Sequence, residues 1–272
     1  QKPIKHPQNV HFIRMSLDDF STLASQKINL PIHLKEAYKC CDFKCAYGLI
    51  FEDYLKEYDF WGHCDLDLVW GDLRCFLNEN VLEQYEKIYP LGHLSLYRNT
   101  EQMKRALMLS GSEKGDYIEV FTDEKHYAFD ELRGIYLILK KNNISQYDKY
   151  EFADISPVFR RMKIVSDYTC YDNNYNHQIF IYKAGRIERY YLKKNREIGK
   201  DEFAYLHFQK RKYTDNQLIA EPSQIYVFTA DGFIPLQDGL ITEKVIRKYN
   251  KYPGCLYEWL EWKDRNHHMI RK

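Results

Sequence analysis

Hydrophobic and polar residues alternate along roughly the first 150 positions with two different periods. A period of two residues predicts strands, and a period of three to four residues predicts helices. The predicted strands are 9–15, the stretch around Asp65 and Asp67, 92–98 and 117–121. The predicted helices are 16–27, 34–58, 81–86, 100–109 and 131–139. Strands and helices in alternation favour an α/β sandwich with a mostly parallel sheet.

The pattern changes after about Phe152, where hairpins replace the alternation. The predicted elements are a hairpin at 179–193 that turns at Ala184-Gly185, a strand at 203–208 and a hairpin at 224–236 around Asp231-Gly232. The tail 243–272 is aromatic and basic, and we expect it to be helical with a break at Pro253-Gly254.

Asp65 and Asp67 are the strongest candidates for chemistry. In a strand both side chains would project from one face, while Leu66 and Leu68 would turn into the core. Two adjacent carboxylates repel each other unless a cation lies between them. Oxygen ligands at this spacing suit Mg²⁺ or Mn²⁺, which usually also bind substrate phosphates. Two solvated acids at a strand end are the structural alternative.

A second group of candidates lies in the segment Tyr205-Leu206-His207-Phe208-Gln209-Lys210-Arg211. The imidazole of His207 can complete a metal site that two carboxylates began. Lys210 and Arg211 could balance the charge of a diphosphate. A partly buried histidine beside two solvated bases is the structural alternative.

A third group comprises Asp130, Glu131, Asp42 and Lys44. Asp130 is predicted to cap the helix 131–139, which alone explains its presence. A carboxylate there could also act as a general base on an acceptor hydroxyl. Asp42 and Lys44 fit contacts with a nucleotide or donor, and a weak surface ion pair is their alternative.

Composition limits the kinds of partner and the cellular compartment that we expect for the protein. The chain has 272 residues, 44% of them hydrophobic, and a formal charge of +1, which gives no case for a nucleic-acid partner. Cys40, Cys41 and Cys45 cluster without a fourth zinc ligand, so we expect reduced cysteines in a cytoplasmic protein. No apolar run approaches the roughly 20 residues of a membrane span, and no leader is recognisable.

Six segments between Lys39 and Arg211 occur in a characteristic order: CDFKCAYG, YDFWGHCDLDLVWGDLR, GHLSLYRN, FDE, FADIS and EFAYLHFQKR. This set resembles a bacterial glycosyltransferase family of the GT-A type, which acts in capsule, exopolysaccharide or lipopolysaccharide synthesis. The resemblance implies a Rossmann-like, mostly parallel sheet flanked by helices, within a single domain over 1–272. About 1–152 would bind nucleotide-sugar and metal, and about 153–272 would complete the site and end in the tail.

The resemblance also implies a reaction. The implied reaction transfers a hexose from a UDP-sugar to a glycan or lipid-linked acceptor. Galactose, in pyranose or furanose form, is the donor sugar that the resemblance suggests. Mn²⁺ or Mg²⁺ would bind Asp65, Asp67 and His207 and would bridge to the diphosphate. If the reaction inverts the anomeric centre, Asp130 or Glu131 is the expected base. The expected donor contacts are Asp42, Lys44, Tyr47, Asp65, His93, Lys210 and Arg211.

One departure from that family concerns the start of the chain. Its members usually open with a strand and an Ile-x-x-Pro-Tyr-Phe-Gly type loop that helps to hold the nucleotide, and nothing like it precedes Asn9. Because the first residue is Gln1 rather than Met, we expect a segment that this sequence lacks.

Two other function classes stay open. The run from Asp65 to Val69 also resembles the first motif of haloacid-dehalogenase-type phosphatases, in which the first Asp is the nucleophile. A non-catalytic carbohydrate-binding protein would use the 24 tyrosines for ring contacts, although many of them are expected in the core and hairpins. The aromatic and basic tail could rest on the inner face of a membrane, or simply pack on the domain.

Overall fold

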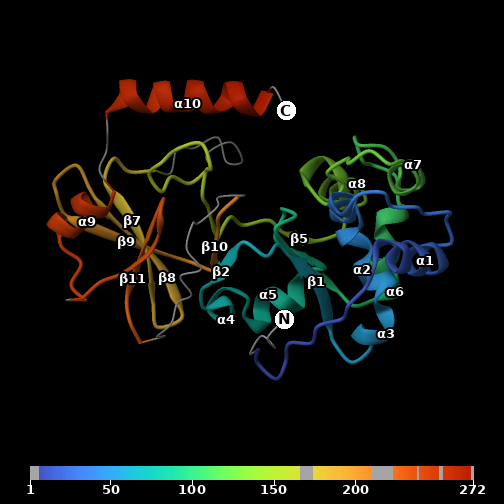
Figure 1. The fold of residues 1–272 in the computed structure, drawn as a ribbon. Helices are drawn as coiled ribbons and strands as arrows, with labels where there is room; N and C mark the ends of the chain where they lie inside the picture. The colour runs from blue at the N-terminus through green and yellow to red at the C-terminus, as the bar shows by residue number, and fades with distance from the viewer. Residues whose placement is uncertain (1–5, 166–173, 210–222, 238, 251–253, 271–272) are drawn as a thin grey trace. The chain divides into compact units, whose positions relative to one another are not determined.

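The computed structural model describes residues 6–165, 174–209, 223–237, 239–250 and 254–270. These residues form two units, each with its own core. The first unit comprises Gln1–Cys64 and Glu83–Lys149, and the second comprises Asp65–Leu82 and Tyr150–Lys272. Figure 1 shows the elements of both units.

The first unit holds a four-stranded sheet in the order β1-β4-β3-β5. Its strands are β1 (Phe60–Cys64), β3 (Lys87–Ile88), β4 (Leu94–Arg98) and β5 (Gln146–Tyr147). β4 pairs antiparallel with both β1 and β3, whereas β3 and β5 run parallel. On the buried face Trp61 of β1 stacks on Tyr97 of β4, with ring centroids 4.4 Å apart.

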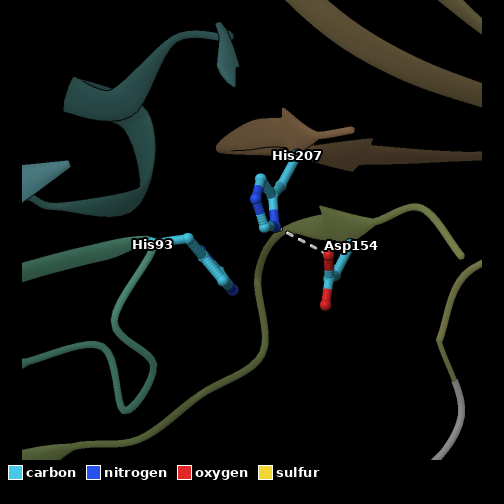
Figure 2. A group of neighbouring side chains, drawn as sticks. All are labelled: His93, Asp154 and His207. Carbon is cyan, nitrogen blue, oxygen red and sulfur yellow. Dashed lines mark hydrogen bonds and ion pairs between the residues drawn. The ribbon is translucent and has the colours of Figure 1, made fainter. Parts of the chain in front are cut away.

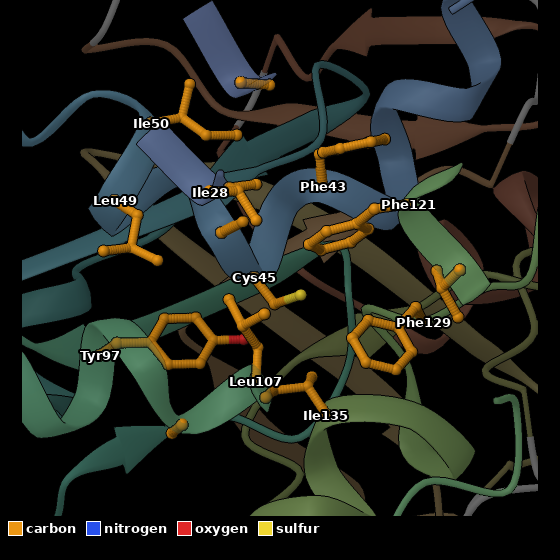
Figure 3. Close-up of a cluster of buried hydrophobic side chains, with 14 of the residues drawn as sticks. Ile28, Phe43, Cys45, Leu49, Ile50, Tyr97, Leu107, Phe121, Phe129 and Ile135 are labelled. Atoms are coloured by element: carbon orange, nitrogen blue, oxygen red, sulfur yellow. The ribbon is translucent and has the colours of Figure 1, made fainter. Parts of the chain in front are cut away.

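Short helices supply the rest of the first unit and its apolar core (Figure 3). They are α1 (Leu17–Ile28), η1 (Ala37–Ala46), α2 (Tyr47–Ile50), α3 (Glu52–Leu55), α6 (Glu101–Arg105), η2 (Ala106–Met108), α7 (Tyr117–Thr122), η3 (Leu132–Tyr136) and α8 (Leu137–Lys141). Between the two units in sequence lies α5 (Glu79–Gln84). In the core, Phe43 of η1 stacks on Phe121 of α7 at 4.4 Å.

The second unit holds two sheets. The smaller has the order β2-β10-β6 and consists of β2 (Leu68–Trp70), β10 (Tyr205–His207) and β6 (Ala153–Asp154). The larger is antiparallel throughout, in the order β12-β11-β7-β8-β9, and consists of β7 (Gln178–Lys183), β8 (Arg186–Leu192), β9 (Ile198–Phe203), β11 (Tyr226–Thr229) and β12 (Gly232–Pro235). Its helices are α4 (Leu73–Phe76), α9 (Glu243–Tyr249) and α10 (Cys255–Ile270).

The prediction of a mostly parallel, Rossmann-like sheet, as in a GT-A fold, is wrong. The described part of the chain forms three small sheets whose pairings are mostly antiparallel, including the five-stranded antiparallel sheet. Parallel neighbours need a crossover of a dozen or more residues, usually a helix. Here β2, the strand after β1 in sequence, pairs in a different sheet, and β4 returns antiparallel beside β1, so no helical crossover joins β1 to a parallel neighbour.

Two predicted strands are also wrong. The segment 9–15 has no strand, because Phe12 and Ile13 are exposed and leave it no buried face. The segment 117–121 begins the helix α7, since the carboxylate of Asp116 accepts a hydrogen bond from the Glu119 amide as an N-cap.

Predictions that rest on local turn and cap chemistry are confirmed. Ser16 caps α1 in a reciprocal arrangement with Asp19. The hairpin of β7 and β8 turns at Ala184-Gly185, where both residues have positive φ as the predicted tight turn requires. The tail forms two helices, of which α9 ends at Tyr249 and α10 begins at Cys255, while Pro253 lies outside the described residues. Among the described helices, none is long and apolar enough to cross a membrane.

The contact between Gly48 of α2 and the Trp61 indole predicts a steric limit. A Cβ at position 48 would lie 2.3 Å from Trp61 Cε2, so Gly48→Ala should lower the free energy of unfolding by about 1–3 kcal/mol in urea denaturation. In Gly48→Ala/Trp61→Phe the smaller ring relieves the clash, so the double variant should lose less than the sum of the two single losses. Strict additivity would contradict this packing account.

Candidate metal centre

The sheet β2-β10-β6 brings together three acidic side chains and one imidazole. In the sheet register, His207 of β10 lies opposite Leu68 of β2 and beside Asp154 of β6. The backbone N–H of Phe208 donates to the carbonyl of Asp67 at 3.1 Å, which extends this pairing past the end of β2. Asp67 is therefore held next to His207 by backbone pairing.

The donor atoms of Asp65, Asp67 and His207 converge on one point. His207 Nε2 lies 3.3 Å from Asp67 Oδ1 and 3.9 Å from Asp65 Oδ2. One ligand atom from each of the three residues lies within 4.8 Å of the others. The imidazole is buried, whereas the Asp65 and Asp67 side chains are 32% and 37% exposed. The group thus opens to solvent on its carboxylate side.

Asp154 fixes the orientation of the imidazole from behind. Its side chain is buried, and its Oδ1 lies 2.8 Å from His207 Nδ1 (Figure 2). Gln209 Nε2 donates to the other oxygen of Asp154 at 2.6 Å. When His207 Nδ1 donates its proton to Asp154, the lone pair of Nε2 faces Asp65 and Asp67. This is the arrangement that orients a histidine ligand toward a metal ion.

The surroundings change the pKa of His207. Burial opposes protonation, but the hydrogen bond and charge of Asp154, with the charges of Asp67 and Asp65, together raise the pKa of His207 above its ordinary value. Without a cation, the proton on Nε2 would face the two carboxylates. A metal ion would have to displace that proton, so metal binding and proton release should be coupled.

The residues present fit a hard divalent cation. Two carboxylates and one imidazole are a suitable donor set for Mn²⁺, and carboxylate oxygens also suit Mg²⁺. Adjacent ligands of an octahedral ion with bonds near 2.1 Å are separated by roughly 3 Å. The observed separations of 3.3 and 3.9 Å require only a small contraction.

The backbone at the acidic pair differs from the predicted strand. Asp65 and Asp67 lie in an irregular bend between β1 and β2, and Leu66 between them is fully exposed. The prediction that Leu66 turns into the core is therefore wrong. The two carboxylates share a side because the chain bends here.

Asp42 is an internal brace of the first unit. It is fully buried, and its carboxylate accepts hydrogen bonds from Lys39 Nζ at 2.9 Å and from the amides of Tyr127 and Phe129 at 3.0 Å. Lys39 Nζ also donates to the carbonyl of Val120 at 2.6 Å. These bonds tie η1 to the segment that leads into Asp130.

Lys44 and Asp130 form a second buried pair in the first unit. Lys44 Nζ lies 3.2 Å from Asp130 Oδ2 and donates to the Gly92 carbonyl at 3.0 Å, while Glu131 Oε2 accepts from the Gly92 amide at 3.2 Å. Burial raises the pKa of Asp130, and the charge of Lys44 opposes that shift. Asp130 does not cap the following helix, so that prediction is wrong: its carboxylate pairs with Lys44.

The remaining predicted residues are distributed as follows. Tyr47 is partly buried in the first unit, where burial raises the pKa of its hydroxyl, and His93 is buried in the same unit. Lys210 and Arg211 lie outside the described residues. Asp154 was not predicted as a site residue. Its signal in the sequence is an acid between Ala153 and Ile155, in an otherwise apolar strand.

Comparisons with known proteins give a family without an assigned activity. The profile described as "Family of unknown function (DUF6625)" matches residues 1–237. No curated protein and no solved structure matches the chain. The matched range includes Asp65, Asp67, Asp154 and His207 and ends before α10.

Replacement of Asp42 should reveal a structural role. Asp42→Asn removes a buried charge and leaves the ammonium of Lys39 uncompensated, so the free energy of unfolding should fall by about 3–5 kcal/mol in urea denaturation. The matched control is Asp53→Asn, which removes exposed ion pairs with Lys27 and Lys56 and should change the midpoint little. Equally small decreases in the free energy of unfolding of both variants would contradict the structural role of Asp42.

The proton on His207 predicts how Mn²⁺ affinity depends on pH. Because the pKa of His207 is raised, the competing imidazolium persists to higher pH, and affinity should increase as pH rises through that pKa. Calorimetry in two buffers of different ionisation enthalpy should detect a released proton. In His207→Gln the affinity should be lower and this proton release should disappear; unchanged release would exclude His207 as the linked group.

Proposed function

We propose that this chain, which belongs to the DUF6625 family, is a glycosyltransferase that uses a divalent cation and a nucleotide-sugar donor. The single observation that carries the proposal is the convergence of Asp65, Asp67 and His207 Nε2 on one solvent-accessible point. The ordered segments that resemble bacterial glycosyltransferases of surface polysaccharide synthesis supply the reaction class. A UDP-hexose donor and a glycan or lipid-linked acceptor are the finer form of the proposal.

The geometry of the second unit supports a separate role for each of these side chains. Asp65 and Asp67 would hold the cation, and His207 would add a nitrogen ligand that Asp154 keeps in one orientation. Three protein ligands leave coordination positions for phosphate oxygens and water. When bound, the cation offsets the negative charge that builds on the departing nucleoside diphosphate.

Residues beyond this group have supporting roles in the proposal. Lys210 and Arg211 follow His207 closely in sequence and would bind the diphosphate, Arg through paired hydrogen bonds and Lys as a point charge. Asp130 and Glu131 stay the candidate bases for an acceptor hydroxyl if the reaction inverts, as the resemblance implies.

The test is a panel of nucleotide sugars with Mn²⁺ and release of nucleoside diphosphate as readout, because slow donor hydrolysis identifies the sugar without an acceptor. Hydrolysis should require the cation. Asp67→Ala should abolish it, and Asp154→Asn should weaken Mn²⁺ affinity roughly 10- to 100-fold by releasing the imidazole.

The matched control is Asp231→Asn, which removes an exposed acid of the second unit that pairs with Arg160 and should leave hydrolysis and affinity unchanged. The proposal is refuted if UDP binds with the same affinity with and without Mn²⁺ and if Asp67→Ala leaves that affinity unchanged. Turnover of p-nitrophenyl phosphate without donor hydrolysis would support a phosphatase instead, and glycan binding without nucleotide or metal would support a carbohydrate-binding protein.

A further inference from the structure

The helix α10 presents large apolar side chains to solvent. Its exposed residues and their exposed fractions are Leu256 72%, Tyr257 59%, Trp259 51%, Leu260 44% and Trp262 48%. A helix of a globular protein normally turns such residues toward a core. Here five of them are exposed within seven consecutive positions, which is an arrangement that needs an explanation.

A charged anchor fixes which side of α10 faces the protein. The carboxylate of Glu258 forms an ion pair with Arg161 and lies 3.7 Å from Lys163 Nζ, and the Glu258 side chain is only 12% exposed. Arg161 in turn donates to the carbonyl of Tyr175 at 2.8 Å. The side of the helix that carries Glu258 is therefore tied to the second unit.

Helical spacing then defines the outward side. With 3.6 residues per turn, Leu256 and Leu260 lie about 160° around the helix from Glu258, and Lys263 lies about 140° from it. Trp259 lies about 100° away and borders that side. The outward side thus combines two leucines and a tryptophan with an ammonium group, which lies 5.2 Å above the Trp259 ring.

A positive charge accompanies the apolar side chains of the outward side, whereas the carboxylate of Glu258 is held on the anchored side. Among the described side chains, Lys263 is the charged group of the outward side. An apolar, aromatic surface that bears positive charge complements an anionic lipid headgroup layer, where tryptophan and lysine are preferred. A second copy would bring the same ammonium group to the contact, and the like charges would oppose close approach.

We propose that α10 docks on an anionic lipid surface through Leu256, Trp259, Leu260 and Lys263. The helix would lie in the plane of the interface, with Glu258 holding it to the second unit. This site lies outside the residues that match the family profile, and it is separate from the metal ligands. The proposal therefore does not depend on the sugar or on the metal.

The test is co-sedimentation of the full chain with vesicles of phosphatidylcholine alone or mixed with phosphatidylglycerol. Binding should favour the anionic vesicles and should shift tryptophan fluorescence to the blue. Leu260→Ser should weaken partitioning roughly 10-fold, as expected for loss of one buried leucine. Lys263→Glu should reduce binding to anionic vesicles only.

The control is Tyr54→Ser, which removes an exposed apolar side chain of the first unit and should bind as the wild type does. All variants should keep the Mn²⁺ affinity of the wild type. A negative result for vesicle binding can therefore be told apart from a negative result for the proposed reaction. Absence of sedimentation, or equal sedimentation of wild type, Leu260→Ser and Lys263→Glu, would overturn the proposal. So would a wild-type dimer in light scattering that Leu260→Ser dissociates, because a second copy would then occupy the surface.

Discussion

The candidate centre depends on the hydrogen bond between Asp154 and His207. A free imidazole can rotate and can carry its proton on either nitrogen, whereas a buried carboxylate at 2.8 Å from Nδ1 selects one tautomer and one direction. The cost of burying that carboxylate is offset because both of its oxygens are hydrogen-bonded, by His207 and Gln209. The solvent-exposed pair Asp65 and Asp67 could not by itself define the position of an ion so closely.

The same physical solution recurs in the first unit with a different outcome. Asp42 is buried and saturated by Lys39 and two backbone amides, so its oxygens are committed to holding η1 in place. Asp130 is buried beside Lys44, and burial raises its pKa while the charge of Lys44 opposes that shift. Burial alone therefore does not identify a reactive acid; what matters is how many donors already occupy its oxygens.

The parts of the fold that were predictable are those that depend on neighbouring residues. The capping box at Ser16 and the Ala184-Gly185 turn need only local chemistry, and both are present. Strand direction is not local: β1 and β4 are antiparallel although their sequence spacing suggested a crossover. The role of Asp154 was equally hidden, because its partner His207 is 53 positions away and only the parallel pairing of β6 with β10 joins them.

For Asp65 and Asp67 the predicted closeness of the two carboxylates is present, although the predicted strand is not. Residues two apart were expected to share a face of a strand, and they do share a side, but through a bend. The bend has a practical consequence at Leu66, whose side chain is wholly in solvent between the two carboxylate-bearing residues. Position 66 is thus a natural attachment point for an environment-sensitive dye, which would sense a nearby ion by its field while leaving the ligands chemically intact.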